Sequence, residues 1–186
     1  MSNVELIESQ QAPLLVQGYY GPDGSASPIT RALAQVPELA EVALPFIGRA
    51  LAPGVLDERT VEIIVLRVSA LNACPYCVAT HTVLAWDAGL SEAETGALGS
   101  PAGERGRFEP REEALVAFCE AFCAAPSPVP RKLLDALRDQ GFADHELVDL
   151  ALVAGATLML NRFCTALGLE PSEATRERLE AVAAAA

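Results

Sequence analysis

Hydrophobic residues recur along most of this chain at the three- and four-residue spacing of a helix. Two stretches show it well: one has Leu33, Val36, Leu39, Val42 and Phe46, and the next has Val61, Ile64, Val65, Val68 and Leu71. No segment of convincing length alternates between apolar and polar residues as a strand would. We therefore expect an all-α protein of about seven or eight helices.

Local signals mark where several of these helices begin and end. Asp57 and Asp144 are expected N-caps, and Ser91 with Glu94 has the spacing of a capping box. Pro37 and Pro45 are expected to break the segment after residue 28 into pieces, because proline removes a helical hydrogen bond.

The chain divides into a short arm and one domain. Residues 1–27 mix polar residues with Gly18, Gly21, Pro22 and Gly24, which favours an N-terminal extended arm. Residues 28–186 are then a single all-α domain, because a chain of 186 residues with 51% apolar side chains fits one core.

Charge and hydropathy exclude two classes of partner. The formal charge is −12 and the pI is about 4.5, so nucleic acid would be repelled.

The first 16 residues carry Glu5 and Glu8 and lack the pattern of a signal peptide, so we expect a cytoplasmic protein. The longest apolar run, 150–160, is shorter than a membrane span, and we expect no membrane role.

The apolar segment Val148–Leu160 lacks a polar side. A helix of that kind must be covered all round, and a chain of this size covers few helices so fully. We therefore expect a homo-oligomer.

The candidate chemistry lies in residues 62–81, EIIVLRVSALNACPYCVATH. Cys74 and Cys77 form a Cys-x-x-Cys pair with Pro75 just inside it, and proline favours the first position of a helix. Cys74 is then an N-cap, where the partial positive charge of the helix end stabilises a thiolate. The pair is a candidate redox centre.

A base and a carboxylate accompany the two cysteines. His81 follows Cys77 by four residues, so both lie on one helix face, and Glu62 lies on the preceding helix. If the two helices form a hairpin, Glu62 can orient His81 or exchange a proton with Cys77. Which cysteine attacks first stays open, because the helix start favours Cys74 and the nearby His81 favours Cys77.

Ser69 and Tyr76 are candidates for the substrate pocket. Ser69 is seven residues from Glu62 and can hold a relay water, although a helical serine is commonly satisfied by its own backbone. Tyr76 can donate a hydrogen bond to a bound peroxide or can simply shape the surface.

The remaining cysteines favour structural roles. Cys119 and Cys123 are four residues apart on one expected helix, so a second redox or metal site is an alternative to the burial typical of cysteine. Cys164 has an apolar helical context and is expected in the core.

Two alternatives to a redox pair follow from the residues alone. Cys74, Cys77, His81 and Glu62 are all competent zinc ligands, although a structural zinc site usually has a second Cys or His pair at suitable spacing. The second alternative is a purely structural Cys-x-x-Cys pair at a helix start, with no chemical role. The remaining histidine, His145, lies in the first turn of an expected helix, where a solvent-facing role is typical.

The arrangement of Glu62, Cys74, Cys77 and His81 resembles the active-site signature of the AhpD-like alkylhydroperoxidase branch of the carboxymuconolactone decarboxylase family. The segment Asn161-Arg162 with Ala166-Leu167-Gly168 is similar to one in peroxidase-related members. Where that signature often has a histidine between the cysteines, this chain has Tyr76.

The resemblance implies a helical fold with a hairpin that carries the cysteine pair, in dimers, trimers or hexamers. It implies that Cys74 and Cys77 cycle between dithiol and disulfide while Glu62 and His81 relay protons. We expect a hydroperoxide or small disulfide as substrate, a thiol or dithiol as electron donor, and no cofactor or metal. The non-redox decarboxylase branch, which lacks the cysteine pair, is the alternative within the family.

Overall fold

The computed structural model describes residues 2–103, 106–124 and 128–185. Its helices are η1 (Ser9–Gln11), α1 (Leu14–Gln17), α2 (Pro28–Leu33), α3 (Pro37–Ala50), α4 (Glu58–Leu71), α5 (Pro75–Asp87), α6 (Glu92–Gly99), α7 (Pro110–Cys123), α8 (Arg131–Asp139), α9 (Asp144–Leu167) and α10 (Glu173–Ala185). No strand occurs in these ranges, which confirms the all-α prediction. The helices outnumber the predicted seven or eight because α1 and α2 are too short to show a period.

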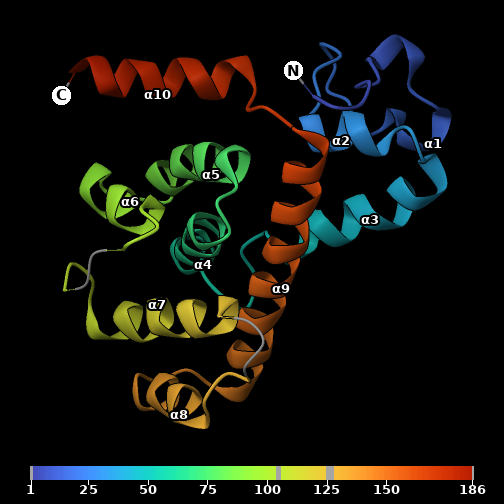
Figure 1. Cartoon of the computed structure of the whole chain (residues 1–186). Coiled ribbons are helices and arrows are strands. Elements are labelled where there is room, and N and C mark those ends of the chain that lie inside the picture. The colour runs from blue at the N-terminus through green and yellow to red at the C-terminus, as the bar shows by residue number, and fades with distance from the viewer. Residues whose placement is uncertain (1, 104–105, 125–127, 186) are drawn as a thin grey trace.

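Helix α4 occupies the centre of the larger group of helices (Figure 1). It packs against α5, α6, α7 and α9, and every residue from Thr60 to Ala70 is buried. The sequence predicted one buried stripe on this helix. Because neighbours cover it on all sides, the polar Glu62, Arg67 and Ser69 are buried as well and need partners inside the protein.

The predicted helix starts agree with the structure except at α9. The Asp57 carboxylate accepts the Thr60 N–H at 2.8 Å, and the capping box of α6 is present. At α9 the N-cap is Ala143 and not Asp144, which is the first helical residue. Glu146 replaces the expected cap, because its carboxylate accepts the Ala143 N–H at 2.7 Å.

The two prolines that were expected to break the early helical segment behave differently. Pro37 separates α2 from α3 and is the first residue of α3, where a missing N–H has no cost. Pro45 lies inside α3, which continues through it to Ala50, so the predicted break at this residue was wrong.

The N-terminal segment, expected as an extended arm, includes η1 and α1. Buried Ala12 and Val16 pack in one cluster with Ala40 and Leu44 of α3. Residues 3–7 run past the C-terminal end of α9, where the Asn3 N–H donates to the Leu167 carbonyl at 2.7 Å. The segment therefore covers the end of α9.

Helix α9 is long and apolar enough to cross a membrane by length and composition, with a mean hydropathy of 1.5 over its most apolar 18 residues. The uninterrupted apolar run 150–160 covers less than half of this helix. In the structure α9 packs against α3, α4, α5, α7 and α8. These contacts bury 44% of that window and account for the apolar residues that face the domain, whereas apolar residues on the other side of α9 stay exposed.

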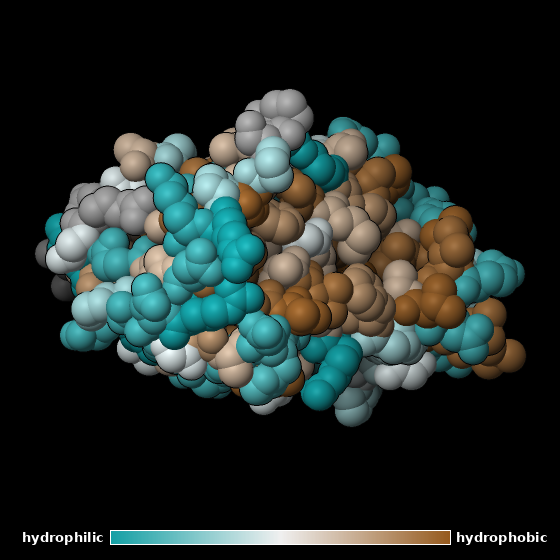
Figure 2. Space-filling view, turned by 90° about the horizontal axis from the view of Figure 1, so that it is seen from below, coloured by the Kyte–Doolittle hydropathy of each residue, from teal (hydrophilic) through white to brown (hydrophobic). Residues whose placement is uncertain are grey.

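One side of α3 and α9 remains apolar and exposed. Figure 2 shows hydrophobic side chains gathered over the half of the molecule that carries these helices, with hydrophilic ones dominating the opposite half. The exposed side chains are Leu39, Val42 and Phe46 on α3 and Val148, Leu152 and Met159 on α9.

Candidate active site

The connection from α4 to α5 is a tight helix stop that places Cys74 directly after the turn. The Cys74 N–H donates to the Ser69 carbonyl at 3.1 Å, and the Ala73 N–H donates to the Ala70 carbonyl at 3.1 Å, which is the Schellman pattern. Ala73 has a φ of 50°, in the left-handed region that usually belongs to glycine. An L-residue there costs about 1–2 kcal/mol, so the surrounding packing holds this turn in a strained form.

Both cysteines of the pair lie at the start of α5. Cys74 is the N-cap, Pro75 is the first helical residue, and Cys77 is in the first turn. Both are buried, with 0% and 4% of their surface exposed. Their sulfurs therefore lie near the positive end of the helix dipole and away from bulk water.

The two sulfurs differ in their preference for the charged form. The pKa of Cys74 is lowered, first by a side-chain hydrogen bond from Cys164 and then by one from Cys77, and these outweigh its burial. The pKa of Cys77 is raised: a hydrogen bond from Cys164 lowers it, but the proton shared with Cys74 and the burial of the thiol outweigh that bond. These opposite shifts favour Cys74 over Cys77 as the thiolate of the pair.

Glu62 and His81 meet across the hairpin of α4 and α5. The distance from His81 Nδ1 to Glu62 Oε2 is 2.9 Å, and both side chains are largely buried. When the carboxylate is ionised, Nδ1–H donates to it and the lone pair lies on Nε2. A carboxylate thus orients an imidazole that lies one turn after Cys77, on the same helix as both thiols.

The two pocket candidates are both buried beside the thiols. Ser69 is fully buried, and its hydroxyl oxygen accepts a hydrogen bond from Asn161 Nδ2 at 3.0 Å. Tyr76 packs in the same apolar cluster as Cys74 and Cys77, and its burial raises the pKa of its hydroxyl. A hydrogen bond with the Thr80 side chain opposes that rise but does not cancel it, and the raised pKa keeps the phenol protonated at neutral pH.

Two residues of this centre, Asn161 and Cys164, were not among the site residues predicted from the sequence, which placed Cys164 only in the core. Both are buried on α9, and Cys164 belongs to the same cluster as Cys74 and Cys77. The likeness of the Asn161-Arg162 segment to peroxidase-related proteins was the only signal. A separation of 92 residues between Ser69 and Asn161 hid the contact, since periodicity reports only neighbours along the chain.

Cys119 and Cys123 lie apart from this centre, on α7. Cys119 is fully buried, and the Cys123 sulfur accepts a hydrogen bond from Asn72 at 3.5 Å. Residues four apart on a helix have Cβ atoms about 5–6 Å apart, which is too far for a disulfide. In the described ranges, no group of three or more His, Cys, Asp and Glu side chains is arranged to hold a metal ion.

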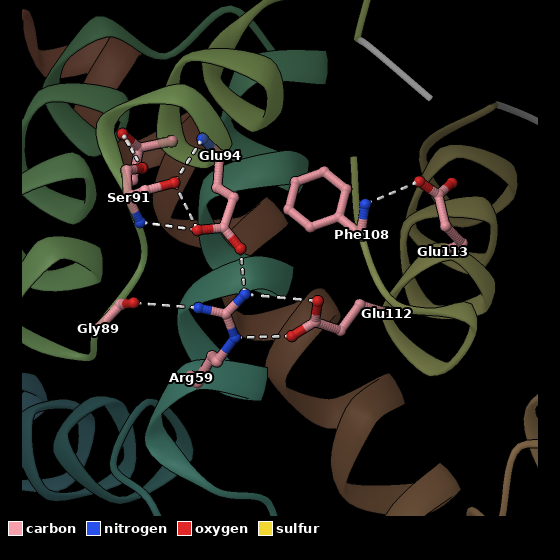
Figure 3. A network of polar contacts seen from close by, with 8 residues as sticks. Arg59, Gly89, Ser91, Glu94, Phe108, Glu112 and Glu113 are labelled. Atoms are coloured by element: carbon pink, nitrogen blue, oxygen red, sulfur yellow. Dashed lines mark hydrogen bonds and ion pairs between the residues drawn. The ribbon is translucent and has the colours of Figure 1, made fainter. Parts of the chain in front are cut away.

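A separate polar network joins the N-terminal end of α4 to its neighbours (Figure 3). Arg59 lies between the carboxylates of Glu94 on α6 and Glu112 on α7, with Nε donating to Glu112 at 2.7 Å and Nη1 donating to the Gly89 carbonyl at 3.2 Å. The hydrogen bonds with Glu112 and Glu94 raise the pKa of Arg59 despite its partial burial. This network fixes helices and includes none of the candidate site residues.

The helical hairpin and its buried thiols define a protein with the AhpD-like fold. A family model described as the carboxymuconolactone decarboxylase family matches residues 37–121, which include all four residues of the signature. The uncharacterized protein YdfG of Bacillus subtilis (strain 168) is 30% identical over 114 residues, which span 61% of this chain and 76% of YdfG. The chain belongs to the carboxymuconolactone decarboxylase family.

Solved structures agree with this fold. A peroxidase-related protein from Ralstonia eutropha JMP134, described as an alkylhydroperoxidase AhpD core, matches with a TM-score of 0.83 and 22% identity over 94% of both chains. A peroxidase-related protein from Silicibacter sp. TM1040 matches with a TM-score of 0.80 and 21% identity over 88% of both. The debrominase Bmp8, as a cysteine-to-alanine variant in complex with 2,3,4-tribromopyrrole, matches with a TM-score of 0.76 and 17% identity over 96% of both. These matches confirm the AhpD-like fold.

Proposed function

We propose that this protein is a thiol-dependent oxidoreductase of the alkylhydroperoxidase type, which reduces hydroperoxides or exchanges small disulfides through Cys74 and Cys77. The observation that carries the proposal is a pair of buried thiols at a helix start, on the hairpin in which Glu62 meets His81 at 2.9 Å; the lowered pKa of the Cys74 thiol supports it. A thiolate is the form that attacks peroxides and disulfides. A thiol or dithiol donor then reduces the resulting disulfide.

The geometry supports a two-step cycle. The Cys74 thiolate attacks the O–O bond of a hydroperoxide, an alcohol leaves, and Cys74 becomes a sulfenic acid. The Cys77 thiol then attacks the Cys74 sulfur, water leaves, and a disulfide closes. In this cycle, His81, oriented by Glu62 at 2.9 Å, supplies and removes the protons that the leaving oxygens and the thiols require.

The proposal is tested by thiol counting and peptide mapping after one equivalent of an organic hydroperoxide. We expect two thiols to be lost and a Cys74–Cys77 disulfide to form, with one alcohol released per disulfide. Both thiols remaining free, or Cys119 bonded to Cys123, would contradict the proposal. Both thiols remaining free would also favour the non-redox branch of the family.

The relay is tested with Glu62→Gln and His81→Gln. Proton-relay groups contribute about 10²–10⁴-fold to a rate, so each variant should lose reactivity toward peroxide in that range while it keeps its helical content and melting temperature. Thr82→Val, next to His81 on the same helix, is the matched control. If the variants lose bound zinc and stability but keep their peroxide reactivity, the site is structural and the relay is rejected.

A further inference from the structure

A third sulfur lies in the candidate active site. Cys164, in the last turns of α9, is 1% exposed and packs in one buried cluster with Cys74 and Cys77 at the start of α5. The cluster also holds Tyr76, Ala32 and Leu169. Three of the five cysteines of the chain therefore share one water-excluded space, whereas the other two lie on α7.

The three thiols of this cluster change one another's ionisation. Hydrogen bonding with Cys164, and then with Cys77, lowers the pKa of the Cys74 thiol, and hydrogen bonding with Cys164 also acts to lower the pKa of Cys77. Bonds to these two sulfurs raise the pKa of the Cys164 thiol, so it keeps its proton and acts as the donor. Thiols that pack together in one buried cluster can form a disulfide once their side chains turn to the required geometry.

Asn161 ties the same part of α9 to α4. It lies one turn before Cys164 and donates to the Ser69 hydroxyl oxygen at 3.0 Å, and it acts to lower the pKa of the Cys77 thiol. Its Oδ1 is buried and lacks a hydrogen-bond partner within the described part of the chain. An unpaired acceptor is costly inside a protein, and here it lies beside reactive sulfurs, where a thiol or a sulfenic acid can supply the missing donor.

We propose that Cys164 is a third redox thiol of this centre, able to replace Cys77 as the thiol that closes a disulfide on Cys74. The inference rests on the function proposed above. Both Cys164 and Asn161 lie outside residues 37–121, which the family model matches.

The chemistry balances with two thiols and one hydroperoxide. The Cys74 thiolate takes the terminal oxygen, the O–O bond breaks, and the alkoxide leaves as an alcohol after it gains a proton. The Cys164 sulfur then attacks Cys74, the S–O bond breaks, and water leaves with the Cys164 proton. If a Cys74–Cys77 disulfide has already formed, attack by Cys164 makes a new S–S bond and releases one thiolate, with no net oxidation.

The test uses the full chain with Cys77→Ser, which removes the usual partner of Cys74. Diamide, an oxidant that acts on any close pair of thiols, is used first because it does not depend on peroxide chemistry. We expect a Cys74–Cys164 disulfide on the peptide map and a higher melting temperature than in the reduced variant, because the bond ties α5 to α9. Cys77→Ser with Cys164→Ala should form no intramolecular disulfide, and peroxide should leave a sulfenic acid that dimedone traps.

The wild type provides an independent measurement. Disulfide exchange at alkaline pH should give a detectable fraction of molecules in which Cys164 is bonded to Cys74 or Cys77. Cys119→Ser is the matched control, because Cys119 is equally buried but lies on α7, and it should leave the disulfides of Cys164 unchanged. If Cys77→Ser does not fold, Cys77→Ala and the wild-type map carry the same test.

The failure of this inference and the failure of the proposed function give different results. If Cys164 stays free in both the variant and the wild type, or if the three cysteines bind zinc, the third-thiol inference is overturned. If the wild type reduces peroxide while Cys164 stays free, only this inference fails. If the wild type is inert to peroxide but diamide joins Cys74 to Cys164, the proposed function fails and the inference stands.

Discussion

The charge state of the Cys74 thiol depends on individual hydrogen-bonding groups around it. Its sulfur makes no full capping hydrogen bond, although the Cys77 backbone N–H contributes to its lowered pKa. The largest contribution comes from the Cys164 thiol, on a helix distant in sequence. A helix start alone is therefore not what makes this cysteine acidic.

This dependence predicts a pH shift on substitution of Cys164. Because a lowered pKa leaves Cys74 ionised at lower pH than an ordinary thiol, reactivity should rise with pH earlier than in a free cysteine. Cys164→Ala removes a donor to the thiolate, and a net hydrogen bond of about 1–1.5 kcal/mol corresponds to about one pH unit. In Cys164→Ala, the increase in Cys74 reactivity with pH should therefore occur about one pH unit higher than in the wild type.

Cys164→Ser is the matched control for this shift, because its hydroxyl keeps a donor but cannot form a disulfide. In this variant, the rate at which iodoacetamide alkylates Cys74 should increase over nearly the same pH range as in the wild type. Equal profiles for the alanine variant and the wild type would show that Cys164 does not stabilise the thiolate.

At the scale of elements, α4 determines how the centre is built. Its burial on all sides makes each polar side chain on it dependent on an internal partner. Arg67, which the sequence analysis did not single out, is 2% exposed and donates to the Ser100 carbonyl at 2.6 Å and to Glu120 at 2.9 Å. This contact joins α4 to α7 and to the end of α6.

We expect Arg67→Ala to lower the free energy of unfolding by about 1–3 kcal/mol, because it leaves the Ser100 carbonyl without its donor, breaks the ion pair with the partly exposed Glu120 and leaves a void. Urea denaturation measures this. Arg178→Ala is the control: Arg178 forms an exposed pair with Asp87 at 2.8 Å, and its loss should change stability little. Similar losses in the two variants would contradict the structural role of Arg67.

The sequence predicted the positions of the helices better than the contacts between helices that are distant in sequence. Local signals such as Asp57, Ser91 and Pro75 act within one helical turn, so their positions could be read directly. The hairpin of Glu62 and His81 could be expected because only a short turn separates the two helices. Contacts of Cys164 and Arg67 depend on packing between distant helices, and no local pattern carries that information.

At the scale of the whole molecule, the apolar face of α3 and α9 is the main exposed feature (Figure 2). The apolar segment Val148–Leu160 was predicted to be buried partly by another subunit, and in a single chain Val148 is 70% exposed and Leu152 is 47% exposed. Contiguous exposed apolar surface of this kind usually marks an interface. We propose that a second copy of the chain covers it.

Light scattering at micromolar concentration should therefore give a mass above the 19.6 kDa of one chain. Val42→Asp with Leu152→Asp should shift the mass toward the monomer, because it places charge in the contact. Leu84→Asp, at a comparably exposed leucine on α5, is the control and should keep the wild-type mass. A monomeric wild type would reject the interface.

We expect access to the sulfurs to depend on the N-terminal segment. Leu6 packs against the thiol cluster and also lines a surface cavity of about 370 Å³ with Pro28, Arg31 and Arg176. Leu6→Ala should speed alkylation of Cys74 severalfold without moving its pH profile. Leu14→Ala, an exposed leucine outside the cluster, should leave the rate unchanged, and equal rates in both variants would show that entry lies elsewhere.

The burial of all three sulfurs also affects how fast the protein is inactivated by irreversible cysteine oxidation. Irreversible loss of a cysteine requires a second oxidant molecule to reach a sulfenic acid before a thiol does. Here the competing thiols are already in contact with Cys74, whereas a second oxidant must enter a packed interior. The protein should therefore survive many oxidant pulses with little sulfinic acid, at the expense of speed in each encounter.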